Sequence, residues 1–184
     1  MMKNHRGFTL IELVVVLAVI AIMTVIATTN YRLWLRHSSA VGFQRELLSR
    51  INEARTRSLG ATLQHRVLID LGGETVTLQR GNSGTGTTSW ADINPRVEGK
   101  LGAAVETIIW PNGSPSDNSV SAGTFAFIFN PDGQVLTQRD PTDASTISPL
   151  TQADIRLTAD SAADHATIRV FGWTSKARLL NGWI

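Results

Sequence analysis

The stretch of sequence that determines the fold is residues 13–31, LVVVLAVIAIMTVIATTNY, in which nineteen residues pass without a charged side chain. At a helical rise of about 1.5 Å per residue the segment reaches roughly 28 Å, close to the thickness of a bilayer core. Its β-branched residues would suit a strand, but a lone strand in lipid leaves its backbone groups unpaired. The stretch therefore predicts a membrane-spanning helix.

Glu12 stands at the edge of this apolar segment. A charge at the centre of a membrane helix costs about 2.5–3.5 kcal/mol, and less near the edge, so an intramembrane carboxylate points to a function and a partner. A cleaved secretory signal and an ordinary signal anchor are two alternatives. Ala27-Thr28-Thr29 is a poor cleavage site for a secretory signal, and neither alternative accounts for Glu12.

The charges around the segment set its orientation only weakly. Lys3 and Arg6 before it favour a cytoplasmic N-terminus, but Arg32 and Arg36 flank its other end. Further along, seven arginines and two glutamates lie between residues 32 and 66, whereas residues 67–184 contain eight basic and twelve acidic side chains. The 184-residue chain carries a net charge of only +2 and no cysteine. This composition excludes polybasic proteins, disulfide scaffolds, thiolate zinc sites and cysteine nucleophiles.

Residues 6–13, Arg-Gly-Phe-Thr-Leu-Ile-Glu-Leu, followed by Val-Val-Val-Leu, resemble the class III signal of type IV pilins and type II secretion pseudopilins. The resemblance implies that a prepilin peptidase cuts after Gly7 and methylates the new N-terminal Phe8. It also implies that Glu12 pairs with the terminal amine of an adjacent subunit and sets axial register in a filament. Many family members carry a proline at the position of Thr29, so no proline kink is expected here.

Beyond residue 31 the pattern becomes amphipathic. Val41, Leu47 or Leu48, Ile51, Ala54 and Ser58 recur at helical spacing, and Gly60 is a predicted stop. The helix is therefore expected from Phe8 to about Leu59. The predicted organisation is a leader (1–7), a transmembrane or filament-core helix (8–31), an amphipathic stalk helix (32–60) and a β-rich periplasmic head (61–184).

In the head, the sequence pattern predicts short strands separated by polar loops. Gly72-Gly73 between two alternating segments predicts a hairpin, and Asn130-Pro131-Asp132-Gly133 predicts a tight turn. We expect loops at 81–89, 112–123 and 140–149. Strands are expected at 66–71, 75–80, 105–110, 124–129, 135–138, 155–158, 167–171 and 177–184. The fold class is α+β, with a long N-terminal helix, membrane-spanning in its lower half, packed on a C-terminal antiparallel sheet.

Within the pilin superfamily this layout resembles the GspH/FimT group. The residues that carry the resemblance are Glu53-Ala54-Arg55-Thr56-Arg57, Phe129-Asn130-Pro131-Asp132-Gly133 and Arg169-Val170-Phe171-Gly172. It implies a minor pseudopilin of a type II secretion system, at or near the filament tip and helping to initiate assembly. Its partners would be other pseudopilins, the prepilin peptidase and the bacterial inner membrane. The alternatives are a minor pilin of a type IV pilus and an unrelated membrane-anchored receptor.

The sequence offers little for catalysis. The glycine-rich residues 81–86 lack the Lys-Ser/Thr of a phosphate loop, and the histidines at 5, 37, 65 and 165 are scattered. Asp140 and Asp143 share a loop that could contribute to a calcium site, but two acids are more often simply solvated. We therefore expect no enzyme activity, no cofactor and no metal.

Two further features of the head point to partners. DNA is the less favoured one, because FimT-like relatives bind it through a basic C-terminal motif, matched here by Lys176 and Arg178, with Gly172 displaced by three residues. Two cations on an acidic head are thin support for phosphate binding. Among the tryptophans, Trp34 suits a membrane interface, and at least two in the head should pack in the core. We expect Trp183 to mark a subunit contact.

Overall fold

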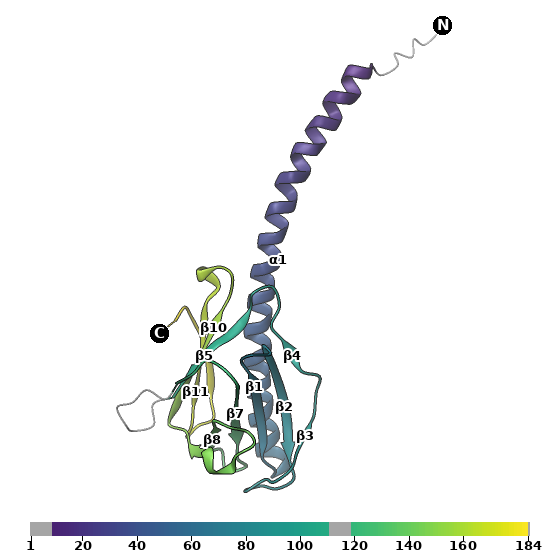
Figure 1. Ribbon diagram of the computed structural model, residues 1–184. Helices are drawn as coiled ribbons and strands as arrows, with labels where there is room; N and C mark the ends of the chain where they lie inside the picture. Colours follow the sequence, from purple (N-terminus) through teal and green to yellow (C-terminus); the bar gives the residue numbers. More distant parts are fainter. Residues whose placement is uncertain (1–8, 111–118, 184) are drawn as a thin grey trace. The chain divides into compact units, whose positions relative to one another are not determined.

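The structure is a computed structural model that describes residues 9–110 and 119–183. The chain divides into two compact units, Met1–Leu35 and Arg36–Ile184. Helix α1 (Leu10–Ala61) contributes to both, and the described residues after it form twelve strands in antiparallel pairs (Figure 1). The α+β fold class, with one long N-terminal helix followed by antiparallel sheets, is confirmed.

In the first unit, the apolar side chains of α1 from Leu10 to Trp34 are exposed. Three of its hydroxyls are used locally: those of Thr24, Thr28 and Thr29 donate to backbone carbonyls one turn earlier, at 2.8, 2.9 and 3.1 Å. By length and composition, α1 could cross a membrane. These three hydroxyls therefore expose no unsatisfied donor to an apolar environment.

In the second unit, one face of α1 joins the hydrophobic core. Its buried residues recur every three or four positions and are Ala40, Phe43, Gln44, Leu47, Ile51, Ala54 and Ser58. Two expectations were wrong in detail. Val41 is only half-buried, because Ala40 and Phe43 take the core face, and Gly60 lies inside the helix. The left-handed residue that follows the helix is Thr62, with φ of 55°.

The first sheet has seven strands in the order β3-β2-β1-β7-β8-β9, with β4 also pairing with β2 (Figure 1). Its inner face carries Val67, Ile69, Val76, Leu78, Phe125, Phe127 and Phe129 into the core. The strands are β1 (His65–Asp70), β2 (Thr75–Gly81), β3 (Trp90–Asp92), β4 (Val97–Glu98), β7 (Thr124–Phe129), β8 (Val135–Gln138) and β9 (Ile147–Pro149).

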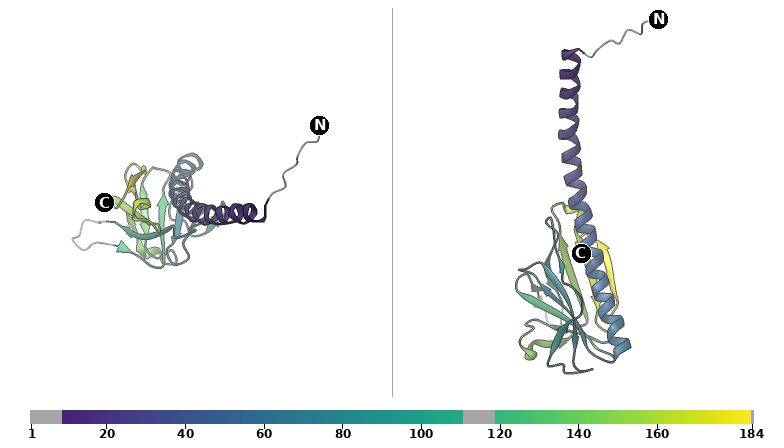
Figure 2. Two further views of the ribbon diagram at one scale, coloured as in Figure 1. Left: turned by 90° about the horizontal axis from the view of Figure 1, so that it is seen from above. Right: turned by 90° about the vertical axis from the view of Figure 1, so that its right-hand side faces the viewer.

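The second sheet has five strands in the order β12-β11-β10-β5-β6, and its inner residues, such as Ile108, Ile155 and Ile168, join the same core. Figure 2 shows residues 36–61 of α1 running beside strands of both sheets. The strands are β5 (Ala104–Ile109), β6 (Ser119–Val120), β10 (Gln152–Thr158), β11 (Ala166–Phe171) and β12 (Ala177–Asn181).

Three of the expected loops contain more structure than predicted. Residue 81 closes β2, residues 119–120 form β6, and residues 147–149 form β9. The short strands β3 and β4 were not expected at all. The strands β3, β4, β6 and β9 each pair with one neighbour at a sheet edge, so their strand conformation depends on that neighbour and not on a local pattern. Residues 112–118 of the second loop lie outside the described residues.

The two sheets are joined at Gly172, which follows β11. Its N–H donates to the carbonyl of Thr151 at 2.9 Å, and its own carbonyl accepts from the N–H of Val135, on β8 of the other sheet, at 2.9 Å. Leu150 donates its N–H to Val135 at 3.0 Å. A side chain at position 172 would overlap the backbone carbonyl of Leu150, so glycine is required at this close approach.

Candidate functional site

The predicted processing residues, Gly7 and Phe8, lie outside the described residues. The next residue, Thr9, caps α1: its hydroxyl accepts the N–H of Glu12 at 3.3 Å, and its carbonyl accepts the N–H of Leu13 at 3.2 Å. Glu12 is thus the third residue of the helix. Thr9 was missed by the sequence analysis, although Thr-x-x-Glu before an apolar run is the spacing of a capping box.

Glu12 is exposed, and no ion pair to it is found within residues 9–110 and 119–183. A carboxylate in the first turn of a helix is stabilised by the partial positive charge of the free amide groups there. That stabilisation is modest and leaves both carboxylate oxygens able to accept from a cation. The chemistry available at this end of the helix is therefore the binding of a positively charged group.

The arginine-rich second half of α1 forms an ionic network on its own surface. Arg50 contacts Glu46 at 2.9 Å and Glu53 at 3.2 Å, and Arg57 contacts Glu53 at 2.8 Å. Partial burial alone would raise the pKa of Glu53. Hydrogen bonds from Arg57 and Asn94, together with the charge of Arg57, instead hold that pKa below its ordinary value. Arg50 and Arg57 are thus neutralised by acids of the same helix.

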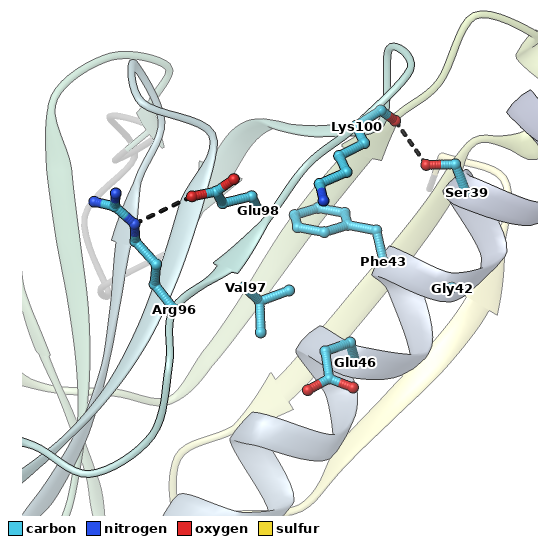
Figure 3. Close-up of a pocket in the computed structure, with 8 residues that line it drawn as sticks. All are labelled: Ser39, Gly42, Phe43, Glu46, Arg96, Val97, Glu98 and Lys100. Carbon is cyan, nitrogen blue, oxygen red and sulfur yellow. Dashed lines mark hydrogen bonds and ion pairs between the residues drawn. The ribbon is translucent and has the colours of Figure 1, made fainter.

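A shallow groove of about 310 Å³ lies between α1 and the segment of residues 96–100 that contains β4 (Figure 3). Phe43 and Val97 extend into it, and the Ser39 hydroxyl donates to the carbonyl of Lys100 at 2.8 Å. Its charged residues have both signs, and Arg96 pairs with Glu98 at 3.2 Å. Because no single charge dominates the groove, its contacts fasten the β4 segment to the helix and do not define a ligand.

The turn between β10 and β11 contacts the part of α1 that begins the second unit. Arg36 pairs with Asp160 at 2.8 Å, and the Nδ1 of His37 lies 2.6 Å from the carboxylate of Asp164. Gln44 donates its side-chain amide to the carbonyl of Asp164 at 2.6 Å. His37 therefore has a structural partner, while His65 is buried and His165 stacks on Trp183 with ring centroids 4.3 Å apart.

The candidate DNA residues, Lys176 and Arg178, are exposed at the start of β12, an edge strand. Arg178 lies opposite Arg169 of β11, but Arg169 is bound at 2.7 and 2.8 Å by both carboxylate oxygens of Asp154. That pairing, offset by partial desolvation, raises the pKa of Arg169. The structure thus brings Lys176 and Arg178 onto one surface without adding a free third cation from Arg169.

The two acids considered for a calcium site, Asp140 and Asp143, have structural roles instead. Asp140 accepts from Thr142, and Asp143 caps a short 3₁₀ turn through Ser145, so the two carboxylates serve their own loop. Within the part of the chain that the structure describes, no three His, Asp or Glu side chains gather as a metal site.

The tryptophans divide similarly. Trp110 is buried, Trp90 is half-buried, and Trp173 is 74% exposed, so only one head tryptophan is fully in the core. The indole N–H of Trp183 donates to Leu157 at 3.1 Å, which gives it a partner within the chain. Its predicted subunit contact stays a prediction.

Comparison with known proteins adds the following findings. Residues 2–28 match the prokaryotic N-terminal methylation motif. No curated protein matches the chain. Among solved structures, the chain is similar to the minor pseudopilin EpsH from the type 2 secretion system of Vibrio cholerae, with 14% sequence identity and a TM-score of 0.48 over 78% of this chain and 97% of that chain. The motif match confirms the resemblance of the N-terminal segment to a methylated prepilin signal, while the roles of Gly7, Phe8 and Glu12 stay predictions.

Proposed function

We propose that the chain is a type IV pilin-like subunit, and specifically a minor pseudopilin of a type II secretion system. The observation that carries the proposal is the N-terminal methylation motif of residues 2–28, placed directly before an apolar helix with Glu12 in its first turn. The assignment as a minor subunit rests on the GspH/FimT-like segments around Glu53, Pro131 and Arg169. The displaced Gly172 and the acidic head make the DNA-binding pilin the second choice.

In this proposal the chain is inserted in the bacterial inner membrane with its N-terminus in the cytoplasm and its head in the periplasm. Prepilin peptidase removes residues 1–7 and methylates Phe8. The new amine of one subunit then meets the carboxylate of Glu12 on its neighbour. In an apolar environment such a pair is far more favourable than either charge alone, so it selects one axial register. The exposed apolar helix supplies the packing surface for the filament.

The processing step is tested by the intact mass of the chain extracted from membranes of cells that contain a prepilin peptidase. We expect the mass of residues 8–184 plus one methyl group. Extraction from cells without the peptidase should give the uncut chain. A mass that retains residues 1–7 in both strains would contradict the proposal and favour an unrelated membrane-anchored protein.

The assembly step is tested by Glu12→Ala, with Thr24→Ala as the matched control because Thr24 is also in the apolar segment and bonds only its own helix. We expect Glu12→Ala to be inserted and processed normally but to lose most of its cross-linking to other pseudopilins. Thr24→Ala should cross-link as the wild type does. Equal cross-linking of both variants would exclude the register role of Glu12.

The alternative is a minor pilin of a type IV pilus that binds DNA during uptake through Lys176 and Arg178. A pull-down of the processed chain separates the two roles, because it should recover secretion-system subunits in one case and pilus subunits in the other. A gel-shift assay at low salt tests the DNA contact directly. A shift that is lost in the variant with both Lys176→Gln and Arg178→Gln would favour the pilus role.

A further inference from the structure

Strand β12 leaves one of its two backbone edges without a neighbouring strand, at the end of the second sheet. On its other edge, the carbonyl of Lys176 accepts the N–H of Phe171 at 2.9 Å, and the N–H of Gly182 donates to His165 at 2.9 Å. Successive residues of an antiparallel strand direct their backbone groups to opposite sides, so every second residue from Lys176 to Gly182 faces β11. The residues that direct their N–H and C=O groups away from β11 are Ala177, Leu179 and Asn181.

This free edge is longer than the other sheet edges in the part of the chain that the structure describes. β12 has five residues, whereas β3 and β9 have three each and β4 and β6 have two each. β9 also contains Pro149, which cannot donate a backbone hydrogen bond. Short length, proline and charge are the means by which sheet edges avoid pairing with other chains. Of these three, β12 has only charge.

The charges beside the free edge are cations without an acid. Lys176 and Arg178 are exposed, and no ion pair to either is found among the described residues. Arg178 lies opposite Arg169 of β11, and Arg169 lies opposite Asp154 of β10, which binds it. This row of the outer face therefore has two arginines and one acid. A strand added beside β12 would place its own side chain opposite Arg178.

These features specify the chemistry of a partner. Like charges oppose the pairing of this edge with a second copy or with a basic segment, whereas acidic side chains match Lys176 and Arg178. Ala177 and Leu179 pack against the core, so the residues opposite them should be apolar. We propose that β12 pairs in antiparallel orientation with an extended segment of a partner protein that alternates apolar and acidic residues. The proposal does not depend on the filament role.

The test uses the full chain in detergent and the capped peptide acetyl-Thr-Val-Ile-Glu-Val-Glu-Thr-amide, whose two glutamates would lie opposite Arg178 and Lys176. Binding is followed by NMR through the hydrogen exchange of the three edge amides, those of Ala177, Leu179 and Asn181. We expect saturating peptide to slow their exchange by at least about tenfold, because each N–H gains a backbone acceptor. The amide of Arg178, which faces β11, should change less. Unchanged exchange of the three edge amides would overturn the proposal.

Three altered peptides separate strand pairing from simple charge attraction. Methylation of the isoleucine nitrogen removes an N–H that would face Leu179 and should abolish binding. Methylation of the first glutamate nitrogen, whose N–H would point away from β12, should leave binding intact. The neutral peptide with both glutamates replaced by glutamine should bind at least about tenfold more weakly. Equal binding of the two methylated peptides would overturn the strand pairing, and equal binding of the Glu and Gln peptides would overturn the role of charge.

Variants of the chain test the same contact from the other side. In the variant with both Lys176→Gln and Arg178→Gln, the preference for the Glu peptide should disappear. In Arg80→Gln, which changes an exposed arginine on β2 of the other sheet, it should persist. Two outcomes would assign the edge to another occupant and overturn the proposal. One is equal protection of the edge amides by a single-stranded DNA oligonucleotide, and the other is protection without peptide that rises with the concentration of the chain.

Discussion

At the scale of single residues, β1 opens with two buried titratable side chains in succession, His65 and Arg66. The two differ in how burial acts on them. The guanidinium stays charged because its ordinary pKa is far above neutrality. The imidazole, with an ordinary pKa of 6.5, can instead remain neutral at no cost above that pH. We therefore expect mild acid to destabilise the fold through the protonation of His65.

The pH dependence of His65 has a definite sign. Burial lowers its pKa from 6.5, and the charges of Arg57 and Arg80 act in the same direction against a hydrogen bond to Leu63. As the pH falls below 6.5, the unfolded chain takes up a proton that the folded chain resists, so the free energy of unfolding decreases. The slope from one such group is at most about 1.4 kcal/mol per pH unit.

We predict that the free energy of unfolding, measured by urea titration of the full chain in detergent, decreases between pH 7.5 and pH 5.5. In His65→Gln this decrease should be clearly smaller, although the variant is less stable at pH 7.5 because it loses buried packing. Glu53, the acid closest in kind to a competing site on this helix, stays ionised in this window because its pKa is lowered. Parallel pH profiles for the two proteins would contradict the assignment.

At the scale of elements, the joint between the sheets depends on the backbone of Gly172. A methyl group there would overlap the carbonyl of Leu150 and force Gly172 away from the chain that links β9 to β10. We predict that Gly172→Ala lowers the free energy of unfolding by about 2–4 kcal/mol, through steric overlap and two weakened backbone hydrogen bonds. Chemical denaturation of the full chain measures the loss.

Gly42→Ala is the matched control for this substitution. Gly42 lies inside α1 with no atom within 4 Å of the added methyl group. Since alanine has the higher helix propensity, this variant should be more stable by roughly 0.5–1 kcal/mol. If both substitutions changed stability by similar amounts and in the same direction, the close approach at Gly172 would not limit the fold.

The element scale also shows what the sequence could predict. The strands at 124–129 and 135–138 occur with the predicted bounds, because alternating or continuous apolar residues end there at turn-forming residues. The edge strand β3 has no such pattern and forms through pairing with β2. The burial of Arg66 was not predictable for the same reason: alternation places it on the outer face of β1, and side chains from other strands, Trp90, Gln79 and Gln138, contact it there.

At the scale of the whole molecule, the core and the apolar segment belong to different units. Every buried hydrophobic residue among those described lies between Ala40 and Val170, within the unit Arg36–Ile184. In the unit Met1–Leu35, the large apolar side chains from Leu10 to Trp34 are exposed, and their burial requires an apolar environment outside the chain. The second unit therefore buries its apolar side chains in its own core, whereas the first unit does not.

We predict that residues 36–184, produced alone, fold without detergent and unfold in one cooperative urea transition. The ionic contacts that fasten the start of this helix, Arg36–Asp160 and His37–Asp164, lie entirely within the fragment and are retained. The control is a fragment that starts at residue 48, which lacks Phe43 and Leu47 from the core and should lose the cooperative transition. Aggregation of residues 36–184 under the same conditions would show that the head requires the apolar segment, and equal cooperativity of the two fragments would show that the core does not depend on α1.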